Sequence, residues 1–394
     1  MAGPISASGV AHAAMDAISA RPDAPRLVIV GIGGTVPKTT QSLLDVAAAR
    51  GLEPGRDVLT ARYRDLRVGV DRGFVRLVGG EGSEGTILAG KGQQSLFLFR
   101  GGGNLRTSHF NTIEKVQSVE GATALTDLDA IRRLGSKSAT NEVLERAGAP
   151  LAATIPVHGV HEATGAFDEI TGRFGAEVAV LKKVNSLGGK DVHFVRSHDD
   201  IRTVIDQEPD ADFVMQEFLP AAKDQDVRVH GVWNHETGTY DLPHSYVRNR
   251  APFHLTPNLA NGGFPTHYVL SPWEEQQVLR SMHALAEGSA HPPLHVGLDL
   301  FPRRPITAST VERNAQLQEE LRAARTRPSV LPDPDTVVIG EAATSAGTKG
   351  TELVLGSGVN PVADRIIDAV LHLRGEARPS AVADAMTGAG SLQA

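Results

Sequence analysis

The stretch that decides the fold is VVIGEAATSAG, Val337 to Gly347, in the last strongly apolar part of the chain. Its first three residues predict a buried strand, and Glu341 stands at the point where that strand runs out. A buried carboxylate without a partner is destabilising by several kcal/mol, so a charge in this place indicates a site for cations. Small apolar residues, Ala342 and Ala343, come next, where a second oxygen ligand is expected. The question is whether this strand forms the floor of a metal–nucleotide site.

Other charged side chains occupy similar places upstream, at strand ends or inside apolar strands. They are Lys182 in VAVLKKV, Glu217 in FVMQEFL, Asp226 and Arg228 in DQDVRVHGV, and Asp299 in VGLDLF. One such charge is most simply an outward-facing residue, but charges of both signs in successive strands favour a shared site for polyphosphate and metal. Carboxylates suit Mg²⁺, and lysine and arginine neutralise phosphates. The loop SLGGKD, with Gly188 and Gly189, is able to bring backbone N–H groups close to phosphate oxygens, although the loop alone is weak evidence.

Composition limits the classes of function. The 394 residues can bury a sizeable core, and the length predicts two or three domains. A hydrophobic content of 41% and a charged content of 22% are those of an ordinary globular protein. The net charge of −7 argues against nucleic acid or an anionic membrane as the main partner. No apolar segment approaches the roughly 18 residues that span a bilayer.

Cysteine usage and the chain ends point to a cytoplasmic protein. The absence of cysteine excludes disulfides and thiol catalysis. The first 25 residues lack a basic region followed by an apolar core, so we expect no signal peptide. We expect residues 1–24 and the Ala/Gly/Ser-rich residues 376–394 to be flexible tails.

The front of the chain reads as an α/β domain. RLVIVGIGG is an apolar strand entering a glycine turn, and TTQSLLDVAAARG has helical spacing. Because GIGG lacks the third glycine of a dinucleotide fingerprint, a tight turn is the simpler interpretation. SLFLFRGGG is another buried strand, and Arg100 at its end either holds a substrate carboxylate or peptide end or has a structural role.

The remainder alternates helices and strands. Helices are predicted in SKSATNEVLERAG, HDDIRTVIDQEPD, SPWEEQQVLRSMHALAEGSA and the polar STVERNAQLQEELRAARTR. Strands are predicted in EVAVLKKV and DFVMQEFL, and VHGVWNHETGTYDLPHSYVRN reads as a hairpin with its turn at NHETG. The polar helix lies in a long excursion after Phe301, which suggests an exposed insertion.

The chain from about Thr126 to Gly350 resembles the ATP-grasp superfamily, in its glutathione synthetase/RimK-like branch of carboxylate–amine ligases. The resemblance rests on six segments in the family's order: SKSATNEVLERAGAPLAATIPV, VLKKVNSLGGKDV, MQEFLPAAKDQDVRV, NRAPFHLTPNLANGG, VGLDLF and VIGEAATSAG. It implies an α/β (α+β ATP-grasp) fold. An N-terminal α/β domain (25–125) would precede two α+β subdomains that clasp ATP, the first over 126–210 and the second over 211–375 with an insertion at 301–334.

The resemblance also assigns roles to residues. Those expected to bind ATP are Lys137, Lys182, Gly188, Gly189, Gln216, Glu217, Phe218, Leu219 and Asp226. Asp299 and Glu341 would hold Mg²⁺, for which Mn²⁺ is an alternative. Arg228, Arg250 and Asn258 are the catalytic candidates, near the phosphates and the reacting carboxylate. The weaker substrate-binding candidates are Arg100, Arg248, Gly262 and Gly263.

One departure bears on the opening question. Where the family places asparagine two residues after the metal glutamate, this chain has Ala343, and where it places proline it has Ala346. One ligand of the usual pair of Mg²⁺ ions is therefore missing. Either water, a phosphate oxygen or the hydroxyl of Thr344 or Ser345 fills the gap, or the site binds nucleotide poorly.

The implied reaction is ATP-dependent amide formation through an acyl phosphate, on small-molecule or peptide carboxylates and amines such as amino acids, peptides or specialised metabolites. A small-molecule kinase and a non-catalytic nucleotide-binding module are the alternatives. The sequence names no base for the amine; His109, His254 and His267 are candidates, although each is more simply a surface or structural histidine. The resemblance also leads us to expect a homodimer or homotetramer.

Overall fold

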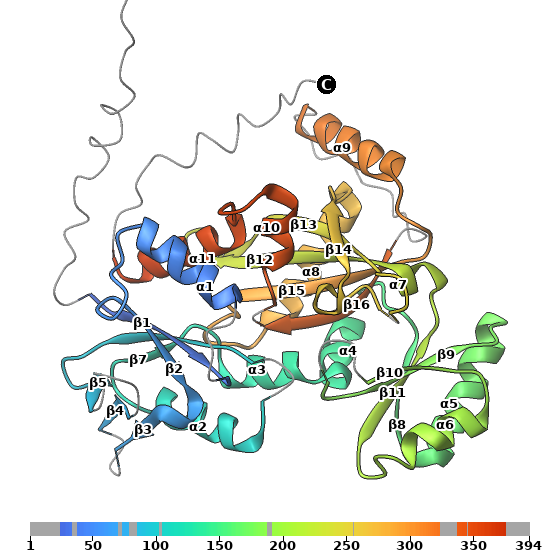
Figure 1. Cartoon of the computed structure of the whole chain (residues 1–394), viewed down its shortest axis with the longest axis horizontal. Coiled ribbons are helices and arrows are strands. Elements are labelled where there is room, and N and C mark those ends of the chain that lie inside the picture. Colours follow the sequence, from blue (N-terminus) through green and yellow to red (C-terminus); the bar gives the residue numbers. More distant parts are fainter. Residues whose placement is uncertain are drawn as a thin grey trace, which may run out of the picture.

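The computed structural model of the chain describes residues 24–33, 38–69, 73–78, 85–101, 105–186, 191–254, 256–323, 337–344 and 346–375. Gly188, Gly189, Ser345, nearly all of the two expected tails and the end of the 301–334 insertion lie outside these residues. Three larger sheets and one small sheet form the described part (Figure 1). None of its helices is both long enough and apolar enough to cross a membrane.

The N-terminal sheet is parallel. Its order is β2 (Val58–Arg62), β1 (Arg26–Gly31), β6 (Ser95–Phe99) and β7 (Ala122–Ala124). On one face, α2 (Thr107–Gln117) and a small antiparallel sheet cover the core. That small sheet consists of β3 (Leu66–Val68), β4 (Phe74–Leu77) and β5 (Thr86–Gly90). The other face is covered by α1 (Lys38–Ala49), as expected from its helical spacing, and by α11 (Pro361–Leu373).

Strand order in this sheet reverses between β1 and β6. The chain leaves β1 through α1 toward β2 on one side, and leaves β6 through α2 toward β7 on the other. Connections that depart in opposite directions open a crevice at the carboxyl ends of the two strands, where ligands of open α/β sheets bind. Gly31 and Arg100 stand at these two ends.

The second sheet is antiparallel, in the order β10 (Val192–Val195), β9 (Ala179–Lys183), β11 (Asp212–Glu217) and β8 (Thr154–His158). Apolar residues of α5 (Gly159–Phe174) and α6 (His198–Ile205) pack on one face of it. Two helices, α3 (Leu128–Gly135) and α4 (Lys137–Arg146), join it to the N-terminal sheet (Figure 1). The predicted strands in EVAVLKKV and DFVMQEFL are confirmed as β9 and β11.

The third sheet is also antiparallel and is the largest. Its order is β14 (Phe264–His267), β13 (Thr239–Asn249), β12 (Gln225–Asn234), β15 (His295–Pro302) and β16 (Val337–Thr344). The predicted hairpin is confirmed as β12 and β13, with Asn234 paired to Thr239 at its turn. Apolar residues of α8 (Pro272–Ala286) bury one face of this sheet. The short helix α7 (Pro220–Asp224) contacts β12 and β15, and α10 (Lys349–Leu355) contacts β13 and β14.

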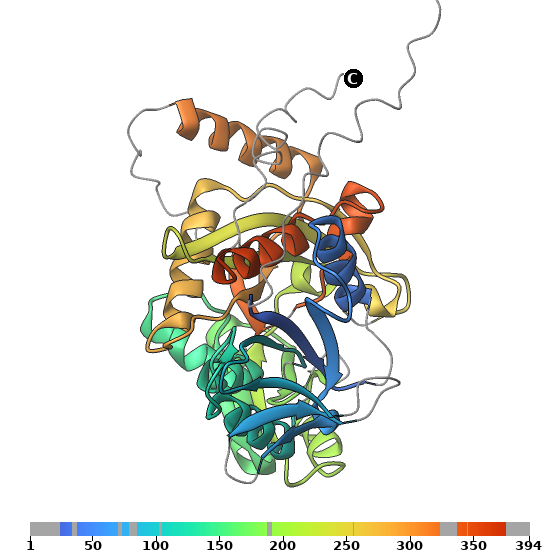
Figure 2. The ribbon, with the colours of Figure 1, turned by 90° about the vertical axis from the view of Figure 1, so that its left-hand side faces the viewer.

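The polar helix expected in the insertion is present as α9 (Ala308–Ala323), on the outside of the molecule (Figures 1 and 2). Two buried amides attach it to the body. Asn314 Nδ2 donates to the carbonyl of Val269 at 3.0 Å, and Gln318 Nε2 donates to the carbonyl of Leu270 at 3.0 Å. The helix is therefore held by hydrogen bonds more than by an apolar face.

The last helix of the described residues completes the first core. In Figures 1 and 2, α11 lies beside α1 above β1, and its apolar residues join those of β1 and α1 in one cluster. The guanidinium of Arg374 then donates to the carbonyl of Pro25 at 2.6 Å and to Asp57 Oδ1 at 3.2 Å. The N-terminal sheet and α11 thus form one packed body.

Candidate nucleotide site

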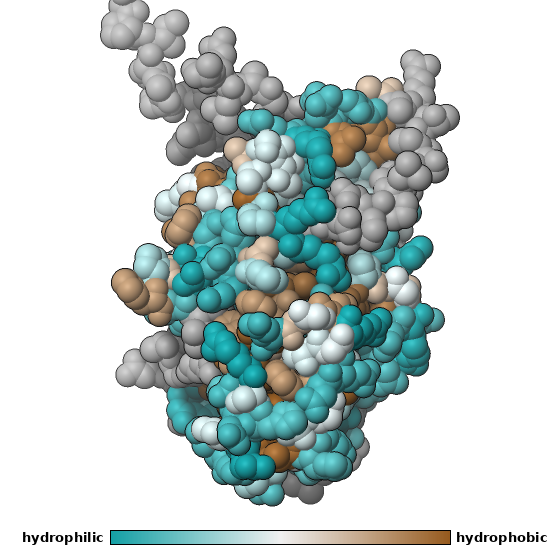
Figure 3. Space-filling model, turned by 90° about the vertical axis from the view of Figure 1, so that its right-hand side faces the viewer, coloured by the Kyte–Doolittle hydropathy of each residue, from teal (hydrophilic) through white to brown (hydrophobic). Residues whose placement is uncertain are grey.

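A cavity of about 750 Å³ lies between the sheets. Strands β9 to β11 supply one wall, the uncovered face of the third sheet supplies the floor, and the carboxyl ends of β1 and β6 close the far end. Most of the sequence-predicted residues line it, namely Arg100, Lys182, Gln216, Glu217, Phe218, Leu219, Asp226, Arg228, Arg248, Asn258, Asp299 and Glu341. Figure 3 shows the face on the side of the second sheet as mostly hydrophilic, with apolar side chains gathered at mid-height.

One end of the cavity is an apolar slot. Phe194 of β10 and Phe218, just after β11, meet edge to face at 5.5 Å between ring centroids. Val180 and Val192 line the same wall. The neighbouring carboxylate of Glu217 is occupied, because Oε1 accepts from Arg303 Nη1 at 2.9 Å and Oε2 accepts from the Ala153 amide at 3.3 Å. This slot suits a planar ring such as adenine.

Lys182 of β9 projects across the cavity. Its Nζ donates to Gln216 Oε1 at 2.7 Å, lies 3.6 Å from Glu341 Oε1, and sits over the Phe301 ring, 4.7 Å from its centroid. Burial lowers the pKa of Lys182, while the Glu341 carboxylate opposes that effect. An incoming phosphate would exchange one anionic partner of this lysine for another.

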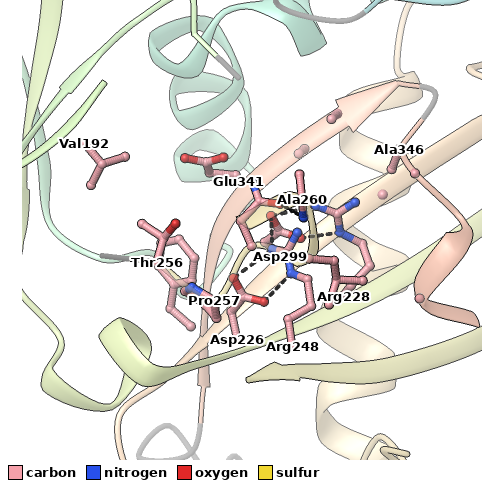
Figure 4. A pocket seen from close by; sticks show the side chains of 18 of the residues that line it. Val192, Asp226, Arg228, Arg248, Thr256, Pro257, Ala260, Asp299, Glu341 and Ala346 are labelled. Atoms are coloured by element: carbon pink, nitrogen blue, oxygen red, sulfur yellow. Dashed lines mark hydrogen bonds and ion pairs between the residues drawn. The ribbon is translucent and has the colours of Figure 1, made fainter. Parts of the chain in front are cut away.

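The floor carries two arginines, each directly opposite a carboxylate in the sheet. Strand register pairs Asp226 with Arg248 and Arg228 with Asp299. Arg248 binds Asp226 through Nε–Oδ1 at 2.5 Å and Nη2–Oδ2 at 2.7 Å. Arg228 binds Asp299 through Nε–Oδ1 at 2.5 Å and Nη2–Oδ2 at 3.0 Å, and Arg248 Nη2 also reaches Asp299 Oδ2 at 2.7 Å. Figure 4 shows the four side chains joined in one network.

Within this network the two carboxyl groups have different pKa values. Burial raises the pKa of Asp226 to about 6, an effect that Arg248 opposes. Burial also acts on Asp299, but the charges of Arg228 and Arg248 outweigh it and lower the pKa of Asp299 to about 2. Burial alone would lower the pKa of Arg248, yet the two carboxylates raise it well above its ordinary value. Asp299 is therefore the carboxylate of this pair that stays ionised at acidic pH, where Asp226 takes up a proton.

Asp299 and Glu341 are paired across β15 and β16, and both line the cavity. Mg²⁺ in nucleotide sites is held by one or two carboxylates together with phosphate oxygens and water, so this pair fits one such ion. Ala343 stands opposite Gly297 and offers only a methyl group for a second ion. Within the described residues no group of three His, Cys, Asp or Glu side chains is placed to hold a metal. The donor set thus suits a cation that arrives with phosphate.

Several predicted residues do not line the cavity. Lys137 Nζ donates to the carbonyl of Ser186 at 2.8 Å, at the start of the glycine loop. Arg250 Nε instead binds Asp224 Oδ1 at 2.6 Å. Gly262 and Gly263 lie in the turn before β14, and a Cβ at Gly263 would come within 2.8 Å of the Asn249 carbonyl oxygen, which explains the glycine. The ligand-binding roles of these residues stay predictions.

The three candidate bases also lie off the cavity lining. His109 Nδ1 accepts from the Arg106 amide at 2.9 Å, and its ring packs on Tyr63, 4.9 Å away, which is a structural role. The lining residues that sequence reasoning missed include Thr39, Thr40, Tyr246 and Lys349. Tyr246 had a signal: it precedes Arg248 by two residues in a strand and so shares its face.

The sequence profile of the RimK-like ATP-grasp domain matches residues 135–321. No curated protein sequence matches the chain.

Solved structures of similar fold are numerous. D-cycloserine synthetase DcsG matches with a TM-score of 0.58 and 14% identity, over 88% of this chain and 99% of that protein. The ATP-grasp ligase PsnB, in complex with a minimal precursor, Mg and ADP, matches with a TM-score of 0.54 and 12% identity, over 90% and 99% of the two chains. A RimK domain ATP-grasp protein from Sphaerobacter thermophilus matches with a TM-score of 0.52 and 17% identity, over 88% of this chain and 99% of that protein. At these identities the similarity establishes the fold.

Proposed function

The chain belongs to the ATP-grasp superfamily, and on that premise we propose that it is an ATP-dependent ligase that joins a carboxylic acid to an amine. One observation carries the proposal. Asp299 and Glu341 face each other on the floor of the cavity, beside Arg228 and Lys182, next to a slot that suits adenine. Cations and carboxylates in this arrangement suit a nucleoside triphosphate, and the far end of the cavity leaves room for a second reactant.

The cofactors are ATP and Mg²⁺. Asp299 and Glu341 would hold the ion, which when bound offsets the charge that develops as phosphoryl moves between two anions. Lys182 would bind a phosphate oxygen in place of Glu341, because its buried ammonium already faces the cavity. The solved complex of PsnB with Mg, ADP and a precursor supports the same set of ligands in this fold.

The proposed chemistry has two steps that balance. A carboxylate oxygen of the acid attacks the γ-phosphorus of ATP, a new P–O bond forms, and the bond to the β-phosphate oxygen breaks to release ADP. The amine nitrogen then attacks the acyl carbon, the C–N bond forms, and the C–O bond breaks to release phosphate. The amine gives up a proton on the way.

Arg228 is the residue best placed to orient the acid. Its guanidinium lines the cavity and is fixed by two hydrogen bonds to Asp299. A guanidinium held in this way donates to a carboxylate and to the oxyanion of the second step without reorganising. Water must be excluded from this part of the cavity during the reaction, because an acyl phosphate hydrolyses.

The test is ADP formation with pooled amino acids and small carboxylic acids, with and without amines, followed by mass analysis of products. We expect turnover that needs an acid and an amine, yields an amide, and is lost in Glu341→Ala. Glu319→Ala, on the outer surface of α9, is the matched control that keeps activity. A stable phosphorylated product without amide would identify a kinase instead, and ATP binding without turnover would oppose both activities.

A further inference from the structure

A chain of hydrogen bonds ends on the ammonium of Lys182. The hydroxyl of Thr154 donates to the carbonyl of Ala152 at 2.9 Å, and its oxygen accepts from Gln216 Nε2 at 2.9 Å. Gln216 Oε1 in turn accepts from Lys182 Nζ at 2.7 Å. Lys182 and Gln216 line the cavity, whereas Thr154, the first residue of β8, does not. The chain therefore connects a residue outside the cavity with the buried cation inside it.

This chain fixes the orientation of the Gln216 amide. Strand register places Thr154 directly opposite Gln216 in the β8–β11 pair, and Lys182 lies on the neighbouring strand β9. Because an ammonium can only donate, the atom of Gln216 that faces it is the oxygen. The NH₂ group then points to Thr154, whose proton is already used on Ala152 and whose oxygen accepts. A flipped amide would place two donor groups against each other.

The Lys182 ammonium has further neighbours besides Gln216. Glu341 Oε1 lies 3.6 Å away, and the centroid of the Phe301 ring lies 4.7 Å away. The contact with Glu341 is the one that a metal ion would remove, since this carboxylate would then bind Mg²⁺. An aromatic face attracts a cation without offering it a directed acceptor. Gln216 Oε1 is therefore the directional contact that decides where the ammonium lies as the phosphates arrive.

The segment that enters β8 is itself held on two sides. The Glu217 amide donates to the Ala153 carbonyl at 2.8 Å, and the Ala153 amide donates to Glu217 Oε2 at 3.3 Å. The Ile339 amide donates to the Pro150 carbonyl at 2.7 Å. This segment thus ties β11 to β16, the two strands that carry the oxygen partners of the ammonium. A side chain on it is well placed to fix the position of another group.

We propose that Thr154 is a positioning residue of the nucleotide site. Its hydroxyl acts through Gln216 to hold the Lys182 ammonium where the phosphates of ATP bind. The proposal rests on the ATP-binding part of the function proposed above, and not on the joining of acid and amine. The phosphates are the part of ATP that should sense loss of this hydroxyl, because Lys182 is directed to them while Phe194 and Phe218 form the slot for the base.

The test compares the binding of AMPPNP, a non-hydrolysable ATP analogue, with the binding of adenosine, each with Mg²⁺ present. Calorimetry measures the first and an NMR titration measures the second. Thr154→Val keeps the shape of the side chain without its hydroxyl. It should weaken AMPPNP binding by about 5- to 10-fold, as expected for loss of one hydrogen bond, and adenosine binding by less than about twofold. Thr154→Ser retains the hydroxyl and should bind AMPPNP within about twofold of wild type.

Thr171→Val is the matched control. Thr171 is half-buried in α5, which packs on the same sheet, and its hydroxyl donates to the Phe167 carbonyl at 2.7 Å. It does not line the cavity, so this variant should bind AMPPNP like wild type.

The outcomes separate the possible failures. Unchanged AMPPNP affinity in Thr154→Val overturns the proposal. An equal loss for AMPPNP and adenosine also overturns it, because that result would mean a general distortion of the site. Wild type that binds no AMPPNP would refute the nucleotide site and the proposal together. Binding requires no bond formation, so bound AMPPNP in a protein that makes no amide counts against the ligase function alone.

Discussion

Asp299 and Glu341 face each other across the β15–β16 ladder, and each is already held by a cation that lines the same cavity. The two carboxylates of this pair differ in their burial and in the number of their basic partners. Asp299 is buried and bound by Arg228 and Arg248, whereas the Glu341 side chain is 36% exposed and lies 3.6 Å from a single lysine. A divalent cation can therefore recruit Glu341 more easily than Asp299.

The first prediction concerns the number of metal ions. Because position 343 offers only a methyl group, wild type with ADP should bind one Mn²⁺, counted by electron paramagnetic resonance. Ala343→Asn supplies an amide oxygen beside Glu341 and should raise the number to two. Ala343→Val, which adds bulk without an oxygen, is the control and should not. Two bound ions in wild type would contradict the prediction.

The second prediction separates two arginines that the sequence grouped together. Arg228→Ala should lower kcat/KM by about 100- to 1000-fold, since Arg228 lines the cavity and its loss removes a fixed donor. Arg250→Ala should change kcat/KM by less than about fivefold, because Arg250 forms a partly exposed ion pair with Asp224. Steady-state kinetics with saturating ATP measure kcat/KM for both variants. Equal losses would mean that Arg250 moves to the cavity during turnover.

The third prediction follows from the pKa of Asp226, which burial raises from 3.8 to about 6. The folded protein keeps this proton at pH values where the unfolded chain has lost it. The contribution of this carboxyl group to the unfolding free energy is therefore greatest below about pH 4 and falls by about 3 kcal/mol as pH rises through 6.

Urea unfolding at a series of pH values tests this dependence. Asp226→Asn cannot release the proton, so its unfolding free energy should change less than that of wild type between about pH 4 and 6. Asp210→Asn, at an exposed position, should follow wild type. An Asp226→Asn profile parallel to that of wild type would show that the carboxyl has an ordinary pKa.

The fourth prediction concerns the close packing beneath α10. A Cβ at Gly350 would come within 2.3 Å of the Tyr246 ring, so Gly350→Ala should displace this helix and lower the thermal midpoint. In α5, a Cβ at Gly172 would meet nothing within 4 Å, and Gly172→Ala should raise stability by up to about 1 kcal/mol through helix propensity. Calorimetry of both variants gives the comparison, and equal destabilisation would contradict it.

Much of the site could be predicted from the sequence because its charges stand in apolar strands. Lys182, Asp226, Arg228, Asp299 and Glu341 all line one cavity, as the pattern indicated. Their partners could not be predicted. The Asp226–Arg248 contact depends on the register of the β12–β13 hairpin, which shifts between His230 and Val232, and no local signal in the sequence reports such a shift.

The fold, too, could be predicted from the sequence only where it depends on local properties. Helical and strand periodicity located α1, α8, α9 and the β12–β13 hairpin, because these are local properties. The strand order of the N-terminal sheet, and the packing of α11 on its outer face, arise from contacts between distant segments. Periodicity within a segment says nothing about which distant segment will cover its apolar side.

The packing of α11 on the N-terminal sheet means that this core can be completed only late in the synthesis of the chain. The contact between Arg374 and Pro25 spans 349 residues, so β1 leaves the ribosome long before the helix that completes its cover has been translated. Leu27 and Ile29 of the nascent strand lack the cover of α11 in that interval. The growing chain therefore carries an unfinished apolar surface until α11 has been translated, and a premature stop before α11 would leave that surface permanently open to chaperones and proteases.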